Sequence, residues 1–359
     1  MKLNTLKVFK IVPLSHHHPN IAIIRLSAMG DVAMTVPVIL ALTAQHPEVR
    51  ITVVSRPFFK PIFKNISNVK FLSVHTHHEH NGLLGIFKLY RDLKALRVTE
   101  IADLHNVLRS KVLRFLFALS GKKVAFTDKG RAEKAALTSL THKKFLPLTT
   151  MVDRHLETFK KLGYTINLDT PYLLKQNVIP LKAIEIIGEK KEKWIGIAPF
   201  AHYSGKTYPI DLMEKVIEEL SNKEGIKILL FGGDSDLERL DTLVNRKSNV
   251  LNFAKKISFK EELHLISNLD VMLSMDSGNA HLAAIYGVKT ITLWGATHPY
   301  AGFAPYNQPS ENCLVADREH YPLLPTSVYG NKKVAGYEDA MRTIPVEKIV
   351  SRVLSQLED

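Results

Sequence analysis

The sequence predicts an α/β protein with two Rossmann-like domains, each a doubly wound parallel sheet, facing each other across a central cleft. Its 359 residues exceed the length that one hydrophobic core usually supports, so two domains are expected. Short apolar runs alternate with helical patterns along the chain, as in βαβ units. Both halves contain a buried strand, a glycine turn that carries an aspartate, and a helix, at 21–42 and at 271–286. This repetition predicts twin domains.

The N-terminal half alternates strands and helices from its first apolar run onward. Apolar runs predict strands at 21–26, 49–55, 69–74, 100–104 and 124–126. Apolar periodicity predicts helices at 32–42, 82–97, 107–119 and 151–162, and a basic loop is expected at 127–134. Pro37 lies early in the first helix, where it either kinks the helix or resets its start. The helix at 82–97 is expected to have one face with Leu83, Ile86, Tyr90 and Leu93.

The C-terminal half repeats this alternation. Strands are predicted at 194–198, 226–231, 250–253, 271–275 and 290–294, and helices at 210–220, 237–244, 259–267, 281–286 and 344–357. The proline-flanked stretch 169–181 is irregular, as expected of an interdomain connection. The expected division is an N-terminal domain at 1–175 with an extension at 1–20, a linker at 176–192, a C-terminal domain at 193–335 and a C-terminal helix at 336–359.

Composition and charge restrict the class of protein. The formal charge of +13 favours an anionic partner, which can be a nucleotide, a nucleic acid or an acidic lipid surface. The single cysteine, Cys313, excludes an internal disulfide framework and fits a reducing compartment. Lysines interrupt the apolar residues of 1–14, which therefore do not resemble a signal peptide, and no apolar run is long enough to span a bilayer. We expect a cytoplasmic protein that can rest peripherally on a membrane.

The turn after the strand at 271–275 predicts a phosphate site. Asp276, Ser277, Gly278 and Asn279 follow the strand directly, and a helix with His281 comes next. Ligands of open parallel sheets sit beyond the carboxyl ends of the strands, where this turn is expected. Free backbone N–H groups and the helix dipole favour an anion there, and a neutral His281 imidazole can bond a sugar or phosphate oxygen. The alternative is an ordinary capped turn.

Two charged residues in other turns are candidates for chemistry. Asp31 follows Gly30 at the first strand-to-helix turn, where its carboxylate is favoured in the ionised form and can accept a proton. Its alternative role is a helix cap. Lys206 lies in a glycine-containing loop just past a strand end, where its ammonium can meet a diphosphate. Its alternative is a solvated surface lysine.

Other features give weaker signals. Asp236 and Glu238 follow Gly232 and Gly233 and are candidates for holding ribose hydroxyls. The histidines at 75–80 lack the spacing of zinc fingers or metalloproteases, so we predict no metal site. The basic helix at 82–97 either docks on anionic lipid or is a core helix with a solvated basic edge. No dinucleotide, P-loop or nucleophile-elbow motif is present, so redox, common ATPase and hydrolase functions lack support.

Taken together, four motifs are similar to the ordered signatures of glycosyltransferase family nine, the lipopolysaccharide heptosyltransferases. They are 25–32 (RLSAMGDV), 103–110 (DLHNVLRS), 206–209 (KTYP) and 274–283 (SMDSGNAHLA). The resemblance covers about 21–306. It implies the GT-B fold, with the acceptor on the N-terminal domain and the nucleotide-sugar on the C-terminal domain. It also implies inverting, metal-independent transfer of heptose from ADP-L-glycero-D-manno-heptose to the lipopolysaccharide inner core, with no cofactor.

The resemblance assigns roles position by position. Asp31 corresponds to the catalytic base and Lys206 to the lysine that contacts the diphosphate. The donor turn corresponds to Asp276, Ser277, Gly278, Asn279 and His281. Candidate acceptor residues within the matched motifs are Ser27, Met29, Gly30, Asp103, His105 and Arg109. The chain departs from the family pattern at 200–205 (FAHYSG), where paired threonines are missing, and at His105 and Asn106, which replace Gln-Gly.

We therefore interpret the protein as an inverting glycosyltransferase that uses a nucleotide-sugar donor, with ADP-heptose expected, and a lipid-linked anionic saccharide acceptor at an anionic membrane surface. Two alternatives stay open: a family member that uses another nucleotide-sugar donor, and a protein of a different class that binds a nucleotide or glycan without catalysis. A nucleic-acid partner is not expected, because no aromatic–basic recognition motif is visible.

Overall fold

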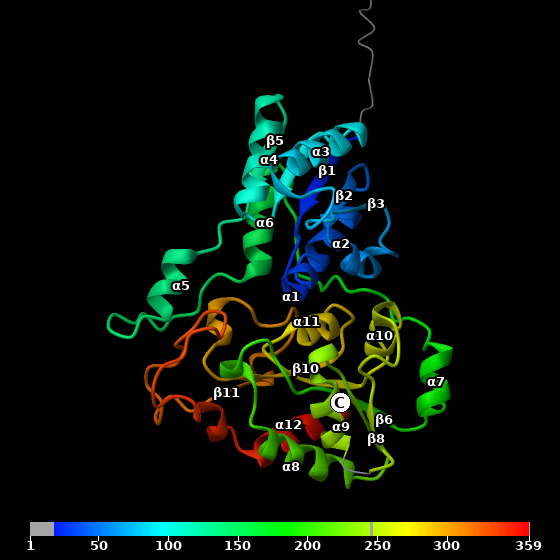
Figure 1. The fold of residues 1–359 in the computed structure, drawn as a ribbon, viewed down its shortest axis with the longest axis vertical. Helices are drawn as coiled ribbons and strands as arrows, with labels where there is room; N and C mark the ends of the chain where they lie inside the picture. Colours follow the sequence, from blue (N-terminus) through cyan, green and yellow to red (C-terminus); the bar gives the residue numbers. More distant parts are fainter. Residues whose placement is uncertain (1–17, 245–246, 359) are drawn as a thin grey trace, which may run out of the picture.

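The computed structural model describes residues 18–244 and 247–358, so most of the predicted extension at 1–20 lies outside the described residues. The N-terminal domain contains a five-stranded parallel sheet of order β3-β2-β1-β4-β5 (Figure 1). Its strands are β1 (Asn20–Ile24), β2 (Arg50–Ser55), β3 (Val69–Ser73), β4 (Glu100–Asp103) and β5 (Lys123–Phe126). Its helices are α1 (Met29–Ala33), α2 (Val36–Gln45), the 3-10 helix η1 (Pro57–Phe63), α3 (Gly82–Ala95), α4 (Leu108–Leu119), α5 (Arg131–Leu137) and α6 (Met151–Leu162).

The C-terminal domain contains a six-stranded parallel sheet of order β11-β10-β9-β6-β7-β8. Its strands are β6 (Lys193–Ala198), β7 (Ile226–Leu230), β8 (Val250–Asn252), β9 (Val271–Met275), β10 (Lys289–Trp294) and β11 (Cys313–Val315). The α-helices of this half are α7 (Leu181–Ile187), α8 (Ile210–Ser221), α9 (Leu237–Val244), α10 (Phe259–Ile266), α11 (Gly278–Ala284) and α12 (Val346–Glu358). Short 3-10 helices are η2 (Ser204–Lys206), η3 (Asp234–Asp236), η4 (Pro299–Ala301), η5 (Ser310–Asn312) and η6 (Ala340–Thr343).

Helices cover both faces of each sheet, as the doubly wound prediction requires. Along β1, Ile21 and Ile23 pack with α2, η1 and α6, whereas Ala22 and Ile24 pack with α3 and α4. In the C-terminal domain one face packs against α8, α9 and α12, and the other against α10 and α11. The alternation follows from the two-residue period of a strand. The predicted fold class is confirmed.

Several predicted elements differ from the structure. The expected loop 127–134 contains the start of α5, and the expected linker 176–192 contains α7. The short edge strand β11 was not predicted, because three residues give too little periodicity. Helix α11 begins at Gly278 rather than at 281, because Ser277 is its N-cap and the helix starts at the next residue. Pro37 resets the helix start: it lies in the first turn of α2, where its missing N–H costs nothing.

The predicted apolar face of α3 is wrong at Leu83. That side chain is 69% exposed, whereas Leu89 is buried with Ile86 and Leu93. The buried positions 86, 89 and 93 follow the three- and four-residue spacing of a helix face, and residue 83 lies in the first turn of the helix. An exposed Leu83 therefore joins the outer surface of the domain.

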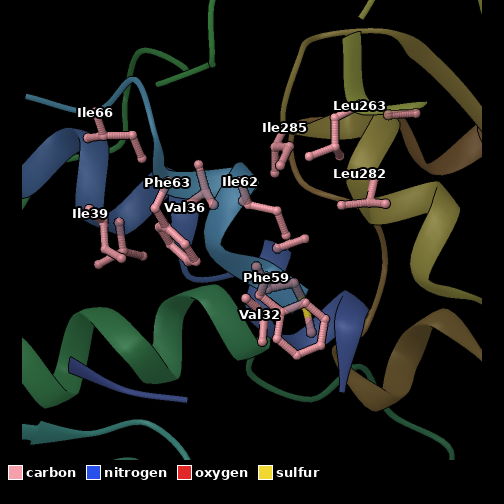
Figure 2. Packing of buried hydrophobic residues seen from close by; sticks show 14 of the residues in the cluster. Val32, Val36, Ile39, Phe59, Ile62, Phe63, Ile66, Leu263, Leu282 and Ile285 are labelled. Atoms are coloured by element: carbon pink, nitrogen blue, oxygen red, sulfur yellow. The ribbon is translucent and has the colours of Figure 1, made fainter. Parts of the chain in front are cut away.

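The two domains share one continuous apolar cluster. Phe59 and Ile62 of η1 lie between α2 of the N-terminal domain and Leu263 and Ile285 of the C-terminal domain (Figure 2). The Phe58 ring stacks on the Phe259 ring at a centroid distance of 4.2 Å. The cluster places α1 and η1 directly against α10 and α11, so the amino-terminal ends of α1 and α11 meet.

The segment that follows β5 also reaches the other domain. The backbone N–H groups of Leu148 and Met151 donate to the carbonyl oxygens of Tyr300 and Gly302, at 2.9 Å each. Lys143 Nζ donates to the carbonyl oxygen of Pro325 at 2.8 Å. Helix α5 lies on this segment, away from its own sheet and beside the C-terminal domain (Figure 1). Across the described ranges 18–244 and 247–358, no helix combines the length and the apolar character needed to cross a membrane.

Candidate active site

Two glycines allow the paired turns to meet. A Cβ added to Gly30 in α1 would lie 2.6 Å from Cδ2 of His281 in α11. A Cβ added to Gly278 would collide with the Met29 side chain. These glycines therefore serve close packing between the domains, and the residues around them form a junction between the two predicted motifs.

The Asp31 carboxylate is held by a buried arginine. Its Oδ2 lies 2.5 Å from Arg25 Nη2 and accepts a hydrogen bond from the Ala28 N–H at 3.2 Å. Arg25 is itself fixed by its donation to the carbonyl oxygens of Ser27 and Leu104. Burial would raise the pKa of Asp31, but the charge and hydrogen bond of Arg25, together with the Ala28 N–H, outweigh burial and lower it. The carboxylate is therefore ionised at neutral pH.

Cations surround one side of Asp31. A cavity of about 210 Å³, which we name the basic cavity, is lined by Arg25, Ser27, Ala28, Asp31, His105, Lys129, Lys134, Met151, Phe303 and Tyr329. Lys134 Nζ lies 4.1 Å from the centre of the Phe303 ring. Burial, and then the nearby Arg154 charge, lower the pKa of Lys134 to about 8. Burial is also the main reason that the pKa of His105 falls to about 4, so its imidazole is neutral.

A second cavity joins Asp31 to the predicted donor residues. This turn cavity has a volume of about 390 Å³ and is lined by Ala28, Met29, Gly30, Asp31, Met34, His202, Tyr203, Lys206, Asp276, Ser277, Gly278, His281, Phe303, Val328 and Tyr329. Asp31, Phe303 and Tyr329 line both this cavity and the basic cavity. The two cavities therefore meet at the Asp31 carboxylate.

Lys206 is oriented by an ion pair and by a glycine. Its Nζ lies 3.2 Å from Asp276 Oδ2, which also accepts a hydrogen bond from Thr297 Oγ1 at 2.9 Å. The alkyl chain of Lys206 occupies the space where a Cβ of Gly330 would lie, and Gly330 has a φ of +81° that favours glycine. The ammonium therefore points toward the turn. One of its three N–H donors faces Asp276, and the other two are available to a ligand.

The turn at 276–279 leaves polar groups without partners. Ser277 occupies the N-cap of α11, yet within the described chain its side chain bonds no backbone N–H and instead contacts Ser274 Oγ at 3.0 Å. Neither Asn279 Oδ1 nor His281 Nδ1, both buried, has a hydrogen-bond partner among residues 18–244 and 247–358. Burial lowers the pKa of His281, against the charges of Asp276 and Asp31, so its ring is neutral. Buried groups of this kind normally have partners, which indicates a place for a ligand.

Asp236 and Glu238, the two acids predicted to hold ribose hydroxyls, do not line the cavity that adjoins the turn cavity. This glycine cavity, about 250 Å³, is lined by Met29, Phe58, Gly232, Gly233, Asp234, Lys255, Ile257, Phe259, Glu262 and Asn279. Asp236 Oδ2 accepts the Gly233 N–H at 2.9 Å, and Glu238 is exposed on α9. Asp234, rather than either of them, faces the cavity. A larger cavity, about 630 Å³, lies between α2, η1, the segment 172–177 and α10, and Asp31 is not among its lining residues.

The remaining predicted acceptor residues have structural contacts. Buried Asp103 accepts the N–H groups of His105 and Asn106 at 3.1 and 2.7 Å and pairs with Arg114, which orients the turn that carries His105. Arg109 lies apart from the basic cavity and donates to the carbonyl oxygen of His80 at 2.5 Å. In the part of the chain that the structure describes, no group of three or more acids, histidines or cysteines is placed to hold a metal ion.

Sequence reasoning missed residues that enter the site from distant segments. Lys129 and Lys134 come from the segment after β5, and Phe303 and Tyr329 from loops of the C-terminal half. The basic composition of 127–134 indicates an anion site, but the sequence does not show that Lys129 and Lys134 point toward Asp31.

The comparisons with known proteins decide the family. A family model for glycosyltransferase family 9 (heptosyltransferase) matches residues 86–332, well over half of the chain. The chain belongs to glycosyltransferase family 9. This confirms the resemblance drawn from the four motifs and identifies the protein as a glycosyltransferase.

Curated relatives of this family 9 glycosyltransferase are heptosyltransferases. Lipopolysaccharide heptosyltransferase 3 of Escherichia coli is 24% identical over 337 residues, which cover 90% of this chain and 93% of the relative. Lipooligosaccharide heptosyltransferase 2 of Haemophilus influenzae is 28% identical over 302 residues, with 78% and 84% coverage.

Solved structures share the fold of this family 9 glycosyltransferase. A glycosyl transferase family 9 protein from Veillonella parvula has a TM-score of 0.75 at 18% identity, covering 95% of this chain and 98% of that one. The Escherichia coli heptosyltransferase WaaC with ADP has a TM-score of 0.67 at 19% identity, covering 94% and 99%. The two facing Rossmann-like domains are the predicted GT-B fold.

Proposed function

We propose that this protein transfers heptose from ADP-L-glycero-D-manno-heptose to the inner core of lipopolysaccharide, with inversion and without a metal ion. The observation that carries the proposal is the junction of two cavities at Asp31. One cavity is lined by cations and the other by Lys206 and the 276–281 turn. The family, the names of the heptosyltransferase relatives and WaaC with bound ADP support the choice of sugar and nucleotide.

Asp31 is the proposed base. The acceptor hydroxyl oxygen attacks the anomeric carbon from the side opposite the diphosphate, a new C–O bond forms, and the bond to the diphosphate oxygen breaks. Asp31 accepts the hydroxyl proton as the oxygen attacks. Because Arg25 keeps the Asp31 carboxylate ionised, the carboxylate can accept a proton at neutral pH. A carboxylate with a lowered pKa is a weak base, so proton transfer follows, rather than leads, C–O bond formation.

Lys206 is the proposed partner of the leaving diphosphate. Negative charge grows on the diphosphate oxygens as the bond to the sugar breaks, and a fixed ammonium in a half-buried cleft stabilises that charge more than water does. Asp276 and Thr297 hold the lysine in place before the donor binds. The uncapped N–H groups of Ser277, Gly278 and Asn279 and the His281 ring are proposed to bond the phosphate and sugar oxygens.

The basic cavity is the proposed acceptor site. Arg25, Lys129 and Lys134 line it around a single carboxylate, which suits an anionic saccharide. Ser27, Met29, Gly30 and His105 surround Asp31 there or in the adjoining turn cavity, whereas Asp103 is proposed to position His105. For Arg109 we propose an indirect role, through the 75–80 loop that it holds.

Helices α3 and α4 form the proposed membrane-facing surface at the cytoplasmic leaflet. The exposed large apolar side chains on them are Leu83, Leu84, Phe87, Leu108, Phe115 and Leu119. Exposed basic residues on the same helices are Lys88, Arg91, Lys94 and Lys111. The two helices lie beside each other at the end of the N-terminal domain that points away from the C-terminal domain (Figure 1). Apolar anchors among cations suit an anionic lipid surface.

Vesicle co-sedimentation tests this surface. Wild-type protein is expected to pellet with vesicles that contain anionic phosphatidylglycerol and to stay in the supernatant with purely zwitterionic vesicles. A Leu84→Gln, Phe87→Gln double variant is expected to lose binding, while Leu181→Gln, which changes an equally exposed leucine on α7, retains it. Equal binding by all three proteins would refute the assignment.

A transfer assay tests the function itself. The protein is incubated with ADP-heptose and deep-core lipopolysaccharide, and ADP release and acceptor mass are measured. We expect an added heptose in a reaction that chelators do not inhibit. Thermal shift with ADP, UDP, GDP and CMP identifies the nucleotide, because a ligand of the native state raises the melting point. A selective rise with UDP or GDP would discard heptose, and ADP binding without transfer would favour a non-catalytic binding protein.

A further inference from the structure

The cavity of about 630 Å³ lies where the two domains and the chain that connects them come together. It is lined by α2 and η1 of the N-terminal domain, by the connecting segment 172–177 and by α10 of the C-terminal domain, and we name it the linker cavity. No residue of 18–244 or 247–358 lines both this cavity and the basic, turn or glycine cavity. The linker cavity is therefore separate from the site proposed for transfer.

Positive charge enters the linker cavity from each of its three sides. Lys64 directly follows η1, Lys175 lies in the connecting segment and Lys260 lies in the first turn of α10. In the part of the chain that the structure describes, no aspartate or glutamate lines the cavity. The two acids of α10 are placed elsewhere, since Glu261 caps the start of the helix and Glu262 lines the glycine cavity. The cavity is therefore basic and lacks a balancing acid.

The charges of Lys64 and Lys260 act on one side chain, although they come from opposite domains. His264 lies one turn along α10 from Lys260 and also lines the linker cavity. Burial is the main reason that the pKa of His264 is lowered, and the Lys260 charge is the next. The Lys64 charge lowers it too, whereas the Val178 backbone and Glu261 act in the opposite direction. The imidazole is therefore neutral, and two like charges face the same space, where an anion would relieve their repulsion.

The lining suits a phosphate group that is attached to an organic body. A phosphate carries about two negative charges and several acceptor oxygens, and lysine binds it as a point charge. A phosphate ion alone fills only a small part of this cavity. The remaining space is bounded by two aromatic rings and by aliphatic side chains, some of them from the apolar cluster that both domains share (Figure 2); these residues are Tyr172, Tyr286, Leu174, Ile62 and Leu263. The walls therefore leave room for a body the size of a sugar.

We propose that the linker cavity binds a phosphorylated small molecule, whose phosphate lies among Lys64, Lys175 and Lys260 and ties the two domains to the connecting segment. The site is a second ligand site, apart from donor and acceptor. Its ligand regulates the enzyme by fixing the arrangement of the domains rather than by taking part in the reaction.

Two elements couple the linker cavity to the transfer site. Both η1 and α10 separate the linker cavity from the glycine cavity, and each of them lines both cavities. The Phe58 ring of η1 stacks on the Phe259 ring of α10 at a centroid distance of 4.2 Å. A ligand that holds η1 against α10 favours the arrangement in which the two turns meet, so we expect it to strengthen ADP binding. This coupling, but not the phosphate site itself, rests on the proposed function.

Calorimetry with phosphate probes tests the site. The probes are inorganic phosphate and glucose 6-phosphate, glucose is the uncharged control, and excess ADP occupies the proposed donor site. Wild-type protein is expected to bind glucose 6-phosphate more tightly than inorganic phosphate and not to bind glucose. A Lys64→Met, Lys260→Met double variant is expected to bind both phosphates roughly tenfold or more weakly, because each lysine supplies a charge-assisted contact.

Matched variants distinguish the linker cavity from other cations of the protein. Lys134→Met in the basic cavity and Lys215→Met on the exposed face of α8 are expected to bind glucose 6-phosphate as wild type does. Lys64 and Lys260 are exposed, so the double variant is expected to fold, with a ligand-free melting point at or above that of wild type because a repulsion is removed. Loss of binding in Lys134→Met instead would place the phosphate in the basic cavity and overturn the proposal.

ADP titrations with and without glucose 6-phosphate test the coupling. The sugar phosphate is expected to raise the ADP affinity of wild type roughly fivefold and to leave that of the double variant unchanged. Unchanged ADP affinity in wild type would overturn the coupling.

The outcomes also separate this site from the proposed function. Absence of phosphate binding to wild type, or equal binding by the double variant, would overturn the site while leaving transfer from ADP-heptose intact. Equal affinities for inorganic phosphate and glucose 6-phosphate would overturn the organic part of the ligand. Failure of wild type to transfer heptose would overturn the proposed function and leave the phosphate site standing.

Discussion

The β1–α1 turn and the β9–α11 turn each present an aspartate that pairs with a cation. The aspartate is the more exposed partner at the first turn, and the cation is the more exposed partner at the second. In the N-terminal turn the Arg25 side chain is 7% exposed and the Asp31 side chain 25%. At the C-terminal turn the order is reversed: Lys206, which comes from the loop after β6, is 15% exposed, and Asp276 is 9% exposed. The first turn therefore offers a carboxylate and the second an ammonium. An aspartate–cation pair beside the carboxyl end of a strand can serve proton transfer or anion binding, depending on which partner is buried.

The largest expected effect comes from removing the exposed carboxylate. Asp31→Asn keeps the shape of the side chain but cannot take a proton, so kcat is expected to fall by roughly 10²–10⁴-fold. ADP affinity is expected to stay within about twofold of wild type, because the proposed diphosphate contacts lie on the other domain. Turnover assays and ADP calorimetry check both values. Glu157→Gln, an exposed change on α6, is the control, and a kcat close to wild type in Asp31→Asn would reassign the base.

Removing the exposed ammonium is expected to have the next largest effect. Lys206→Met retains most of the alkyl chain that packs over Gly330 but removes the charge, and kcat/KM is expected to fall by roughly 10²–10³-fold. Unlike Asp31→Asn, this variant is expected to lose ADP affinity as well. Lys215→Met, on the exposed face of α8, is the matched control. Unchanged ADP binding in Lys206→Met would show that the two turns do not divide the work as proposed.

The cations of the basic cavity are expected to affect the acceptor alone. Lys134→Met removes one charge-assisted contact of about 1.5–3 kcal/mol and should raise the acceptor KM roughly tenfold or more, with ADP affinity unchanged. A lysine is charged below its pKa, so wild-type acceptor affinity is expected to fall as pH rises through about 8. Lys134→Arg, which stays charged, is expected to lack this alkaline loss. Identical pH profiles for wild type and Lys134→Arg would remove Lys134 from the acceptor site.

The smallest effects are expected at the two glycines between the turns. A methyl group at Gly30 meets the ring of His281, whereas one at Gly278 chiefly meets the flexible end of Met29. Gly30→Ala is expected to cost about 1 kcal/mol of domain contact and roughly fivefold in kcat/KM, and Gly278→Ala less. Steady-state kinetics on the two variants checks the order. A larger loss in Gly278→Ala would indicate that the backbone of α11, rather than the His281 ring, limits the approach of the domains.

The sequence predicted the fold more fully than the site. Strands such as β1, β7 and β9 are mostly apolar runs, and the fold needs only their order and the turns between them. Asp31, Lys206 and the 276–281 turn were found because each lies in a turn or loop that follows a strand, where ligands of parallel sheets usually bind. Their catalytic and binding roles stay predictions. Element boundaries failed where local pattern was short or ambiguous, as at β11 and α5.

The sequence by itself determined the two doubly wound domains, the family motifs and the surplus of positive charge, because each depends on residues that are close together in the chain. Only the tertiary structure decided that Arg25 is buried behind Asp31, that Lys134 lies over Phe303, and that Glu262 faces the glycine cavity. These arrangements join segments far apart in the chain. Burial and ion pairing then set which groups carry charge into the cleft, and neither can be read from neighbouring residues.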